Sequence, residues 1–219
     1  MTAAPRVAVA AAIPLTRAVT WGPLAAGSLV GLAVVGWLGV RDAGVAAQVG
    51  GLRIGAVLLA AGAAFALDDT AAATLASSPT PLSARRALRL TMTLGICVAV
   101  WAAMLGVAGD SAVRTRAGLT VELVGMVAVA FGGASVAARW APNGLGGLAG
   151  GPILLFVMLT ATIIQMHWPH VGTLLPVAPG TPGWEAAHVR WLVLAGGGVA
   201  LVALAALDPA RRLPSARWR

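Results

Sequence analysis

Long apolar stretches, each about 20 residues, recur along this 219-residue chain. The three strongest are Val19–Val40, Leu90–Gly109 and Ala117–Ala138, and Glu122 is the only charged residue inside them. A helix of about 20 residues crosses the hydrocarbon core of a bilayer. Because hydrocarbon offers no hydrogen-bond partners to a backbone, apolar segments of this length are expected to be helices.

Three further apolar stretches are shorter. Ile54–Leu67 becomes long enough if Val45–Leu52 extends it and the long side chain of Arg53 reaches the interface. Pro152–Met166 and Trp191–Leu207 are near the lower limit, and Trp or Arg flanks each of them, as expected at a membrane interface. The sequence therefore predicts an all-α, polytopic membrane protein with six transmembrane helices in a single domain, residues 1–219.

The composition excludes a water-soluble protein. Hydrophobic residues make up 59% of the chain and charged residues 10%, and the mean hydropathy is +0.89, so polar side chains could not cover a water-facing surface. All 15 basic residues are Arg. Arginine beside apolar spans sets orientation and contacts anionic lipids, so the net charge of +8 does not indicate a nucleic-acid partner. The single Cys97 lies inside the third stretch and is interpreted as a small buried hydrophobic residue.

The arginines also predict which side of the membrane the termini face. With six spans, both termini lie on the same side. That side would carry ten arginines: Arg6, Arg17, Arg85, Arg86, Arg89, Arg139, Arg211, Arg212, Arg217 and Arg219. The opposite side would carry five: Arg41, Arg53, Arg114, Arg116 and Arg190. Since basic residues are enriched in cytoplasmic loops, we expect both termini in the cytoplasm and the protein in the cytoplasmic (inner) membrane.

Two segments are expected at the membrane surfaces. Near the N-terminus, a basic residue followed by Val7–Leu15 is similar to the start of a cleaved signal peptide. Pro14 and Arg17 interrupt that run, which favours an interfacial helix on the inner leaflet. The outer segment 167–188 contains four prolines and cannot be one continuous helix. Its apolar part, Val171–Val177, could dip into the membrane as a re-entrant segment.

Small residues predict how the helices pack. A Gly-x-x-x-Gly pattern occurs at Gly27–Gly31 in the first span, and another occurs at Gly146–Gly150 just before the fifth. Such patterns let two backbones approach closely. We interpret both as packing positions within the bundle.

The inner connection between the second and third spans, residues 68–89, predicts a short helix. Two aspartates at its start can cap a helix N-terminus, and Thr70–Ser77 is rich in alanine. The residue before Pro79 is disfavoured in a helix, which ends the segment there. One interpretation is an ordinary loop with local helix. The other is a docking element for a cytoplasmic partner.

This connection resembles that of permeases of type 2 ABC transporters. Those permeases carry a short coupling helix between their second and third spans, often with a Thr-Leu-Leu-x-Ser/Thr-Pro run followed by basic residues. Residues 74–79 read Thr-Leu-Ala-Ser-Ser-Pro, and three arginines follow between 85 and 89. Here one alanine replaces the second leucine, another replaces the acidic residue that often precedes the run, and Thr80-Pro81 adds a turn.

The resemblance extends to the architecture of nearly the whole chain: an N-terminal interfacial helix, six spans, both termini inside, and a larger outer segment between spans five and six. In that family, the outer segment forms short re-entrant helices. The resemblance implies a permease subunit that pairs with a second permease copy or a related chain, and with separate ATP-binding subunits. The residues implied in docking the ATPase are Asp69, Thr70, Thr74, Leu75, Ser78, Pro79, Arg85 and Arg86.

The chain contains no lysine, which excludes one class of enzyme. A P-loop needs a Lys to contact the nucleotide phosphates. If ATP drives this protein, a separate subunit must therefore bind the nucleotide. We expect no cofactor and no catalytic residue in this chain.

Glu122 is the candidate pathway residue. A carboxylate inside a membrane span is costly and points to a role with substrate or protons. The alternative is structural: its side chain could reach outer water, or an arginine such as Arg114 or Arg116.

A histidine cluster supports a different class of function. Met166, His167 and His170 lie close in sequence, and His188 ends the same outer segment. Copper or haem iron could use such ligands, but Pro169 separates two of the histidines and no Cys or carboxylate joins them. Histidines that lie at a membrane interface without binding metal are the more frequent case.

These observations favour the membrane-spanning permease subunit of an ATP-driven ABC exporter. Its spans carry few polar residues, which favours an amphipathic, lipidic, peptide or drug-like substrate. The alternatives are a small membrane redox or metal- or haem-handling protein that uses the outer histidines, and an accessory membrane protein that only assembles a complex.

The six-span topology makes a direct prediction. In a Cys97→Ala background, a cysteine at Ser78 should react with an impermeant thiol reagent only from the cytoplasm, and one at Gly180 only from the exterior. The measurement is labelling of inverted and right-side-out vesicles. If both positions react from the same side, the six-span topology is wrong.

Overall fold

The structure, a computed structural model, describes residues 19–68, 82–108, 115–141, 145–168, 174–175 and 183–206. In these residues it forms six long helices and no strand. They are α2 (Trp21–Val40), α3 (Val45–Ala64), α4 (Leu82–Val107), α5 (Arg116–Trp140), α6 (Gly147–His167) and α7 (Gly183–Ala206), and a short 3₁₀ turn, η1 (Phe65–Leu67), continues α3. All six are long and apolar enough to cross a membrane. The prediction of an all-α, multi-pass protein with six candidate spans is confirmed.

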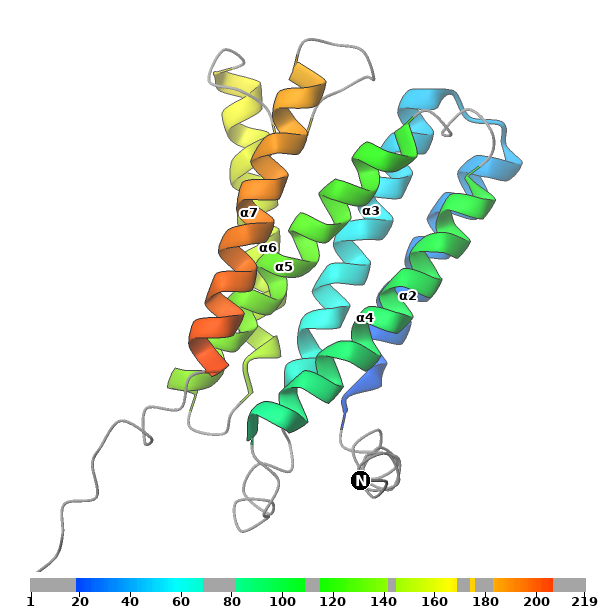
Figure 1. Ribbon diagram of the computed structural model, residues 1–219. Coiled ribbons are helices and arrows are strands. Elements are labelled where there is room, and N and C mark those ends of the chain that lie inside the picture. The colour runs from blue at the N-terminus through cyan, green and yellow to red at the C-terminus, as the bar shows by residue number, and fades with distance from the viewer. Residues whose placement is uncertain are drawn as a thin grey trace, which may run out of the picture.

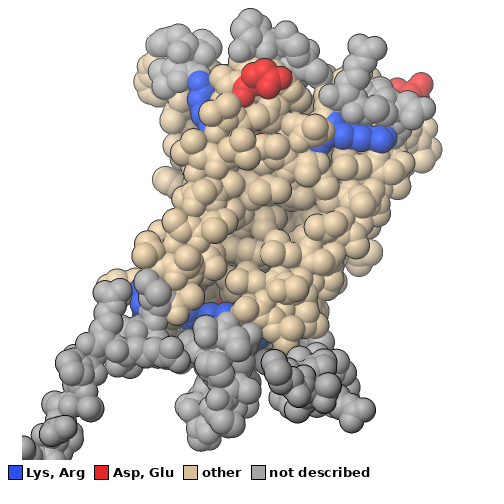
Figure 2. All heavy atoms as spheres, in the orientation of Figure 1, with Lys and Arg blue, Asp and Glu red and all other residues tan. Residues whose placement is uncertain are grey.

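The six helices form one bundle in which successive helices run in opposite directions (Figure 1). The start of α2 and the end of α7 lie at the same end of the bundle, at the bottom of Figure 1. We call this end the inner end and the opposite end the outer end, following the predicted orientation. On the face shown in Figure 2, charged side chains lie near the two ends of the bundle, with uncharged residues between them. α3 and α5 are the most buried helices, and they pack against each other at the centre. α2 packs on α3, while α6 and α7 pack on α5.

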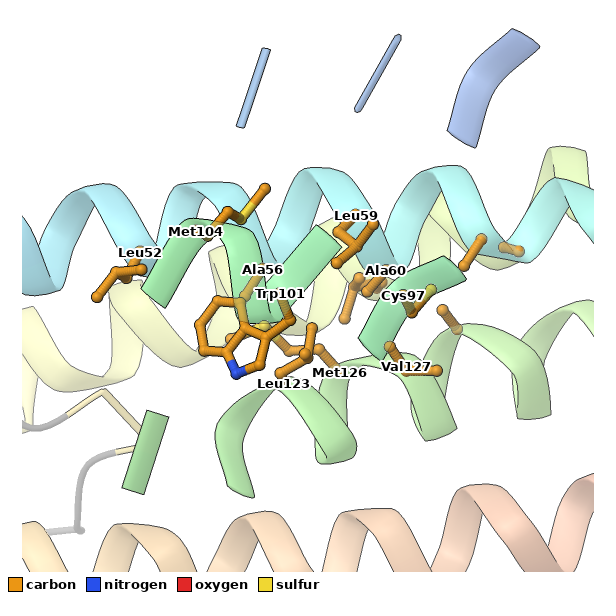
Figure 3. Close-up of a cluster of buried hydrophobic side chains, with 14 of the residues drawn as sticks. Leu52, Ala56, Leu59, Ala60, Cys97, Trp101, Met104, Leu123, Met126 and Val127 are labelled. Atoms are coloured by element: carbon orange, nitrogen blue, oxygen red, sulfur yellow. The ribbon is translucent and has the colours of Figure 1, made fainter. Parts of the chain in front are cut away.

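The hydrophobic core lies where α3, α4 and α5 meet (Figure 3). Cys97, Trp101 and Met104 of α4 contribute to it, and Cys97 is buried, as expected for a small hydrophobic residue. The indole Nε1 of Trp101 donates a hydrogen bond to Thr120 Oγ1 of α5 at 3.0 Å. The polar edge of this deeply placed indole therefore has a partner on the neighbouring helix.

Arg53 and His188, which were expected at a membrane interface and in the outer segment, both lie inside a helix. α3 begins at Val45, as the expected extension of Ile54–Leu67 by Val45–Leu52 requires, and Arg53 lies more than two turns inside it. α7 begins at Gly183, so His188 and Arg190 belong to this helix and not to the outer segment. In the sequence, polar side chains such as these mark the limits of the apolar stretches. In the folded bundle they lie inside helices, because side chains of neighbouring helices interact with them.

Several predicted features lie outside the described residues. These are the interfacial helix before residue 19, the short helix within residues 69–81, and most of the outer segment between α6 and α7. Of that outer segment, Leu174 and Leu175 are described, and both are half-buried against the core. The carbonyl oxygen of Leu174 accepts a hydrogen bond from Trp191 Nε1 at 2.7 Å, which joins the segment to α7.

Both predicted glycine patterns pack within the bundle. Gly27 of α2 faces the backbone of α3 at Leu58, and Gly31 faces Gly55 of the same helix. Gly150 lies against the backbone carbonyl of Ala130 in α5. A Cβ at these glycines would overlap atoms of the facing helix, so their small size sets the distance between helices.

A third glycine series joins α5 to α7. Gly118, Gly125 and Gly132 repeat every seven residues along α5, which places them on one face of the helix. They face His188, Trp191 and Gly198 of α7, respectively. The two helices run in the same direction (Figure 1). This α5–α7 seam therefore keeps one register from the outer end to well past the middle of the bundle.

Two adjacent glycines of α7 provide a matched test of the seam. A methyl group at Gly198 would overlap the carbonyl of Ala128, whereas Gly197 has nothing within 4 Å. We expect Gly198→Ala to lower the free energy of unfolding by about 1–3 kcal/mol, the usual cost of overpacking. Gly197→Ala should be neutral, or stabilising by up to about 1 kcal/mol through helix propensity. The measurement is unfolding in detergent, and equal effects of the two changes would contradict the seam.

Candidate functional site

A buried ion pair joins the two central helices. Arg53 of α3 donates two hydrogen bonds to the carboxylate of Glu122 in α5: Nε to Oε2 at 2.7 Å and Nη2 to Oε1 at 2.7 Å. The side chain of Glu122 is 1% exposed and that of Arg53 is 14% exposed. This two-bond geometry matches the planar guanidinium to the planar carboxylate, and it is the strong form of such a pair.

The ion pair lies beneath the outer end of the bundle. α3, α5 and α7 all begin at this end (Figure 1). Glu122 is six residues into α5 and Arg53 is eight residues into α3. With a rise of 1.5 Å per residue, their Cα atoms lie roughly 9 Å and 12 Å along the helix axes from the outer end. The pair is therefore much closer to the outer end than to the inner end.

A third helix adds His188 to this site. Its Nε2 lies 3.6 Å from Glu122 Oε1. That distance is too long for a hydrogen bond, and Nε2 is buried with no hydrogen-bond partner. The ring packs edge-on to Trp184, with 4.7 Å between ring centroids. Gly118 leaves the space that the imidazole fills, because a Cβ there would overlap the ring.

The structural alternative for Glu122 was contact with outer water or with an arginine such as Arg114 or Arg116. The structure pairs it with a different arginine, Arg53, 69 residues away in sequence. The long side chain of Arg53 was expected to reach the membrane interface. Arg116 is described and its Nε is buried without a partner, while Arg114 lies outside the described residues. Only α3–α5 packing brings the two charges together.

The described histidines do not form the metal cluster that was considered as an alternative. His188 faces Glu122 from inside α7. His167 ends α6, where its Nδ1 lies 3.1 Å from the carbonyl of Ile163 in the same helix. His170 lies outside the described residues. Among the residues that the structure describes, no three His, Cys, Asp or Glu side chains are grouped as a metal site requires.

A second polar cluster lies at the inner end, around Asp68. Its Oδ1 accepts a hydrogen bond from the backbone N–H of Gly147 at 2.5 Å, at the start of α6. Its carbonyl oxygen accepts one from Nη1 of the buried Arg89 of α4 at 3.0 Å. Burial raises the pKa of the Asp68 carboxyl, against the lowering effects of the Gly147 and Gly146 N–H groups and the Arg89 charge. We call Asp68, Arg89 and Gly147 the inner clamp, because they hold α3, α4 and α6 together.

One residue of the implied ATPase-docking set has a described contact. Arg86, in the first turns of α4, donates from Nη1 to the carbonyl oxygen of Ala205 at 3.2 Å. That carbonyl belongs to the last turn of α7, where helix carbonyls lack partners within the helix. The backbone of Arg85 lies in α4. Outside the described residues are Asp69, Thr70, Thr74, Leu75, Ser78 and Pro79.

A surface groove lies between α5 and α7, far from the ion pair. It has a volume of about 410 Å³ and is lined by Val136, Arg139, Trp140, Leu201, Leu204 and Ala205. Its α5 residues lie at least 14 residues beyond Glu122, roughly 21 Å along the helix. The groove therefore belongs to the inner end.

The fold and the charged cluster define a multi-pass α-helical membrane protein with a buried Arg–Glu–His site. Comparisons with protein families, with curated proteins and with solved structures find no match to this chain.

The ion pair predicts a non-additive mutant series. Arg53→Gln or Glu122→Gln would leave one buried charge without its partner, so each should lower the free energy of unfolding by on the order of 3 kcal/mol. The double variant removes both charges and should lose less than either single variant. A double-mutant cycle in detergent measures this coupling. If Glu122 were instead stabilised by water alone, Glu122→Gln would hardly change the free energy of unfolding. The loss in the double variant would then equal the sum of the losses in the two single variants.

Proposed function

We propose that this chain is the membrane-spanning permease subunit of an ATP-driven ABC exporter in the cytoplasmic membrane. The single observation that carries the proposal is the position of the 68–89 connection. It joins the second and third spans, contains the Thr-Leu-Ala-Ser-Ser-Pro run, and meets the bundle at the end where the described chain also begins and ends.

The inner clamp supports a mechanical role for this connection. Asp68 is the last described residue before residues 69–81, and Arg89 follows them in α4. Arg89 bonds back to Asp68, and Asp68 bonds to the start of α6. Arg86 extends these links to the end of α7. A partner that pushes on the connection would therefore act on α3, α4, α6 and α7 together.

The absence of lysine sets the energy source in this proposal. A separate subunit binds and hydrolyses ATP, because this chain cannot form a P-loop. That subunit docks on the connection, and its closure switches the bundle between inward-facing and outward-facing states. A second permease copy or a related chain completes the transporter.

The chemistry of the bundle favours an amphipathic cargo, such as a lipidic, peptide or drug-like molecule. The core at the α3–α4–α5 junction is apolar (Figure 3). The buried charges at the outer end are already paired with each other. In this proposal Glu122 lies near the outer end of the pathway, where its ion pair holds α3 to α5.

A substitution in the connection tests the proposal. Leu75→Asp places a carboxylate on the expected apolar docking contact, and desolvating an unpaired carboxylate costs several kcal/mol. We expect the variant to insert normally and to lose the ATPase partner, or to lose its stimulation of ATP hydrolysis. The matched control is Leu75→Met, which keeps an apolar side chain of similar volume.

The measurement is recovery of an ATP-hydrolysing subunit with the tagged chain from native membranes, followed by ATP turnover of the purified complex. Normal recovery and turnover with Leu75→Asp would remove the main support for the ABC proposal. An absence of any ATPase with the wild-type chain would do the same.

A further inference from the structure

Three ionisable side chains from three helices meet beneath the outer end of the bundle. They are Arg53 of α3, Glu122 of α5 and His188 of α7. Arg53 and Glu122 satisfy each other, whereas Nε2 of His188 has no hydrogen-bond partner and is aimed at Glu122 Oε1. His188 is 8% exposed as a whole residue. A buried imidazole nitrogen without a partner, 3.6 Å from a carboxylate oxygen, needs an explanation.

We propose that His188 and Glu122 form a proton-binding site that opens to the outer side of the membrane. The ligand is a proton, which binds to the Nε2 lone pair of a neutral His188. The product is an imidazolium with an N–H directed at Glu122 Oε1. No other group is consumed or released.

The protonation states of histidine explain why proton binding would shorten the distance of 3.6 Å between His188 Nε2 and Glu122 Oε1. A neutral imidazole that carries its proton on Nδ1 presents a lone pair to the carboxylate, which repels it. The imidazolium presents a positively charged donor instead. Charge-assisted N–H···O bonds have lengths of roughly 2.7–2.9 Å, so the pair would shorten from 3.6 Å by somewhat less than 1 Å.

The surroundings of His188 allow this movement. Glu122 and Gly118 face it from α5, Arg53 lies beyond Glu122 on α3, and Trp184 lies one turn away on α7 itself. Oε1 already accepts one hydrogen bond from Arg53 Nη2, and a carboxylate oxygen can accept a second. The glycines of the α5–α7 seam already place α7 against the backbone of α5, so the shortening comes from small rotations of the His188 and Glu122 side chains.

Proton binding would therefore add a bond that links α7 to α5 and, through Glu122, to α3. Access is from the outer side, because the site lies less than two and a half turns from the outer end and several turns from the inner end. This inference does not depend on the ATP-driven transport proposal. It requires only the Arg53–Glu122–His188 geometry.

Tryptophan fluorescence gives a direct readout. An imidazolium quenches a neighbouring indole more strongly than neutral imidazole does, and Trp184 lies 4.7 Å from His188. His167 and Trp168 form a second pair, at 5.9 Å. The chain in nanodiscs of zwitterionic lipid is titrated from acid to alkaline pH. We expect one quenching component from each pair.

Matched variants assign the two components. One component should come from quenching of Trp184 by His188, so both His188→Gln and Trp184→Phe should abolish it. His167→Gln should leave that component intact. Glu122→Gln should weaken proton binding at His188 by about tenfold, a shift of its midpoint by about one pH unit toward acid. It should not move the His167 component.

Hydrogen exchange tests whether the added bond stabilises the start of α7. At a pH below the midpoint, amides at the start of α7 should exchange several-fold more slowly in the wild-type chain than in His188→Gln. Above the midpoint the two should match. Since both are compared at the same pH, the intrinsic exchange rate cancels.

Three results would overturn the proposal: a Trp184 component that survives His188→Gln, a midpoint that Glu122→Gln leaves unchanged, or equal exchange of α7 at acid pH. If Glu122→Gln does not fold, Arg53→Gln/Glu122→Gln replaces it, because that variant buries no unpaired charge. Its midpoint should still shift toward acid, since the carboxylate that would accept the imidazolium N–H is lost.

Discussion

The buried pair of Arg53 and Glu122 is the constraint on which the rest of the bundle depends. Each charge alone would cost several kcal/mol inside a low-dielectric bundle, so α3 and α5 are held in the one register that satisfies both hydrogen bonds. These two helices are also the most buried of the six described spans. α2, α4, α6 and α7 pack on them, so the position of every outer helix is set relative to a centre that the ion pair aligns.

The α5–α7 seam connects this centre to the third member of the charged site. Glycines every seven residues on α5 let α7 approach closely without bulky contacts, and the first of them makes room for the His188 ring. Packing and electrostatics are therefore linked: the spacing that stacks α7 on α5 also brings the imidazole near Glu122. A bulkier residue at Gly118 would displace His188 from the carboxylate even though it carries no charge.

Polar groups gather at the two ends of the bundle, with an apolar core between them. The outer site joins α3, α5 and α7, while the inner clamp joins α3, α4 and α6. α3 belongs to both. In the transport that we propose, force applied at the inner end would reach the outer site through α3. A proton bound at the outer site would therefore change how readily the bundle switches between its inward-facing and outward-facing states. Rigid helices with bonded ends suit this role better than flexible loops would.

The sequence by itself determined the class of fold, because long apolar runs are expected to form membrane-spanning helices, and six such runs appear at nearly the observed positions. It also identified Glu122 as costly and the two Gly-x-x-x-Gly patterns as packing sites. It could not find Arg53 as the partner, since 69 residues separate the two and an arginine near the end of an apolar run normally marks an interface. It misassigned His188 for the same reason, because a polar residue among prolines and tryptophans looks like a loop. Hydropathy along the sequence indicates the free energy of placing each single side chain in an apolar environment. Only the tertiary structure shows which polar side chains offset that free energy by pairing, because pairing depends on which helices are neighbours.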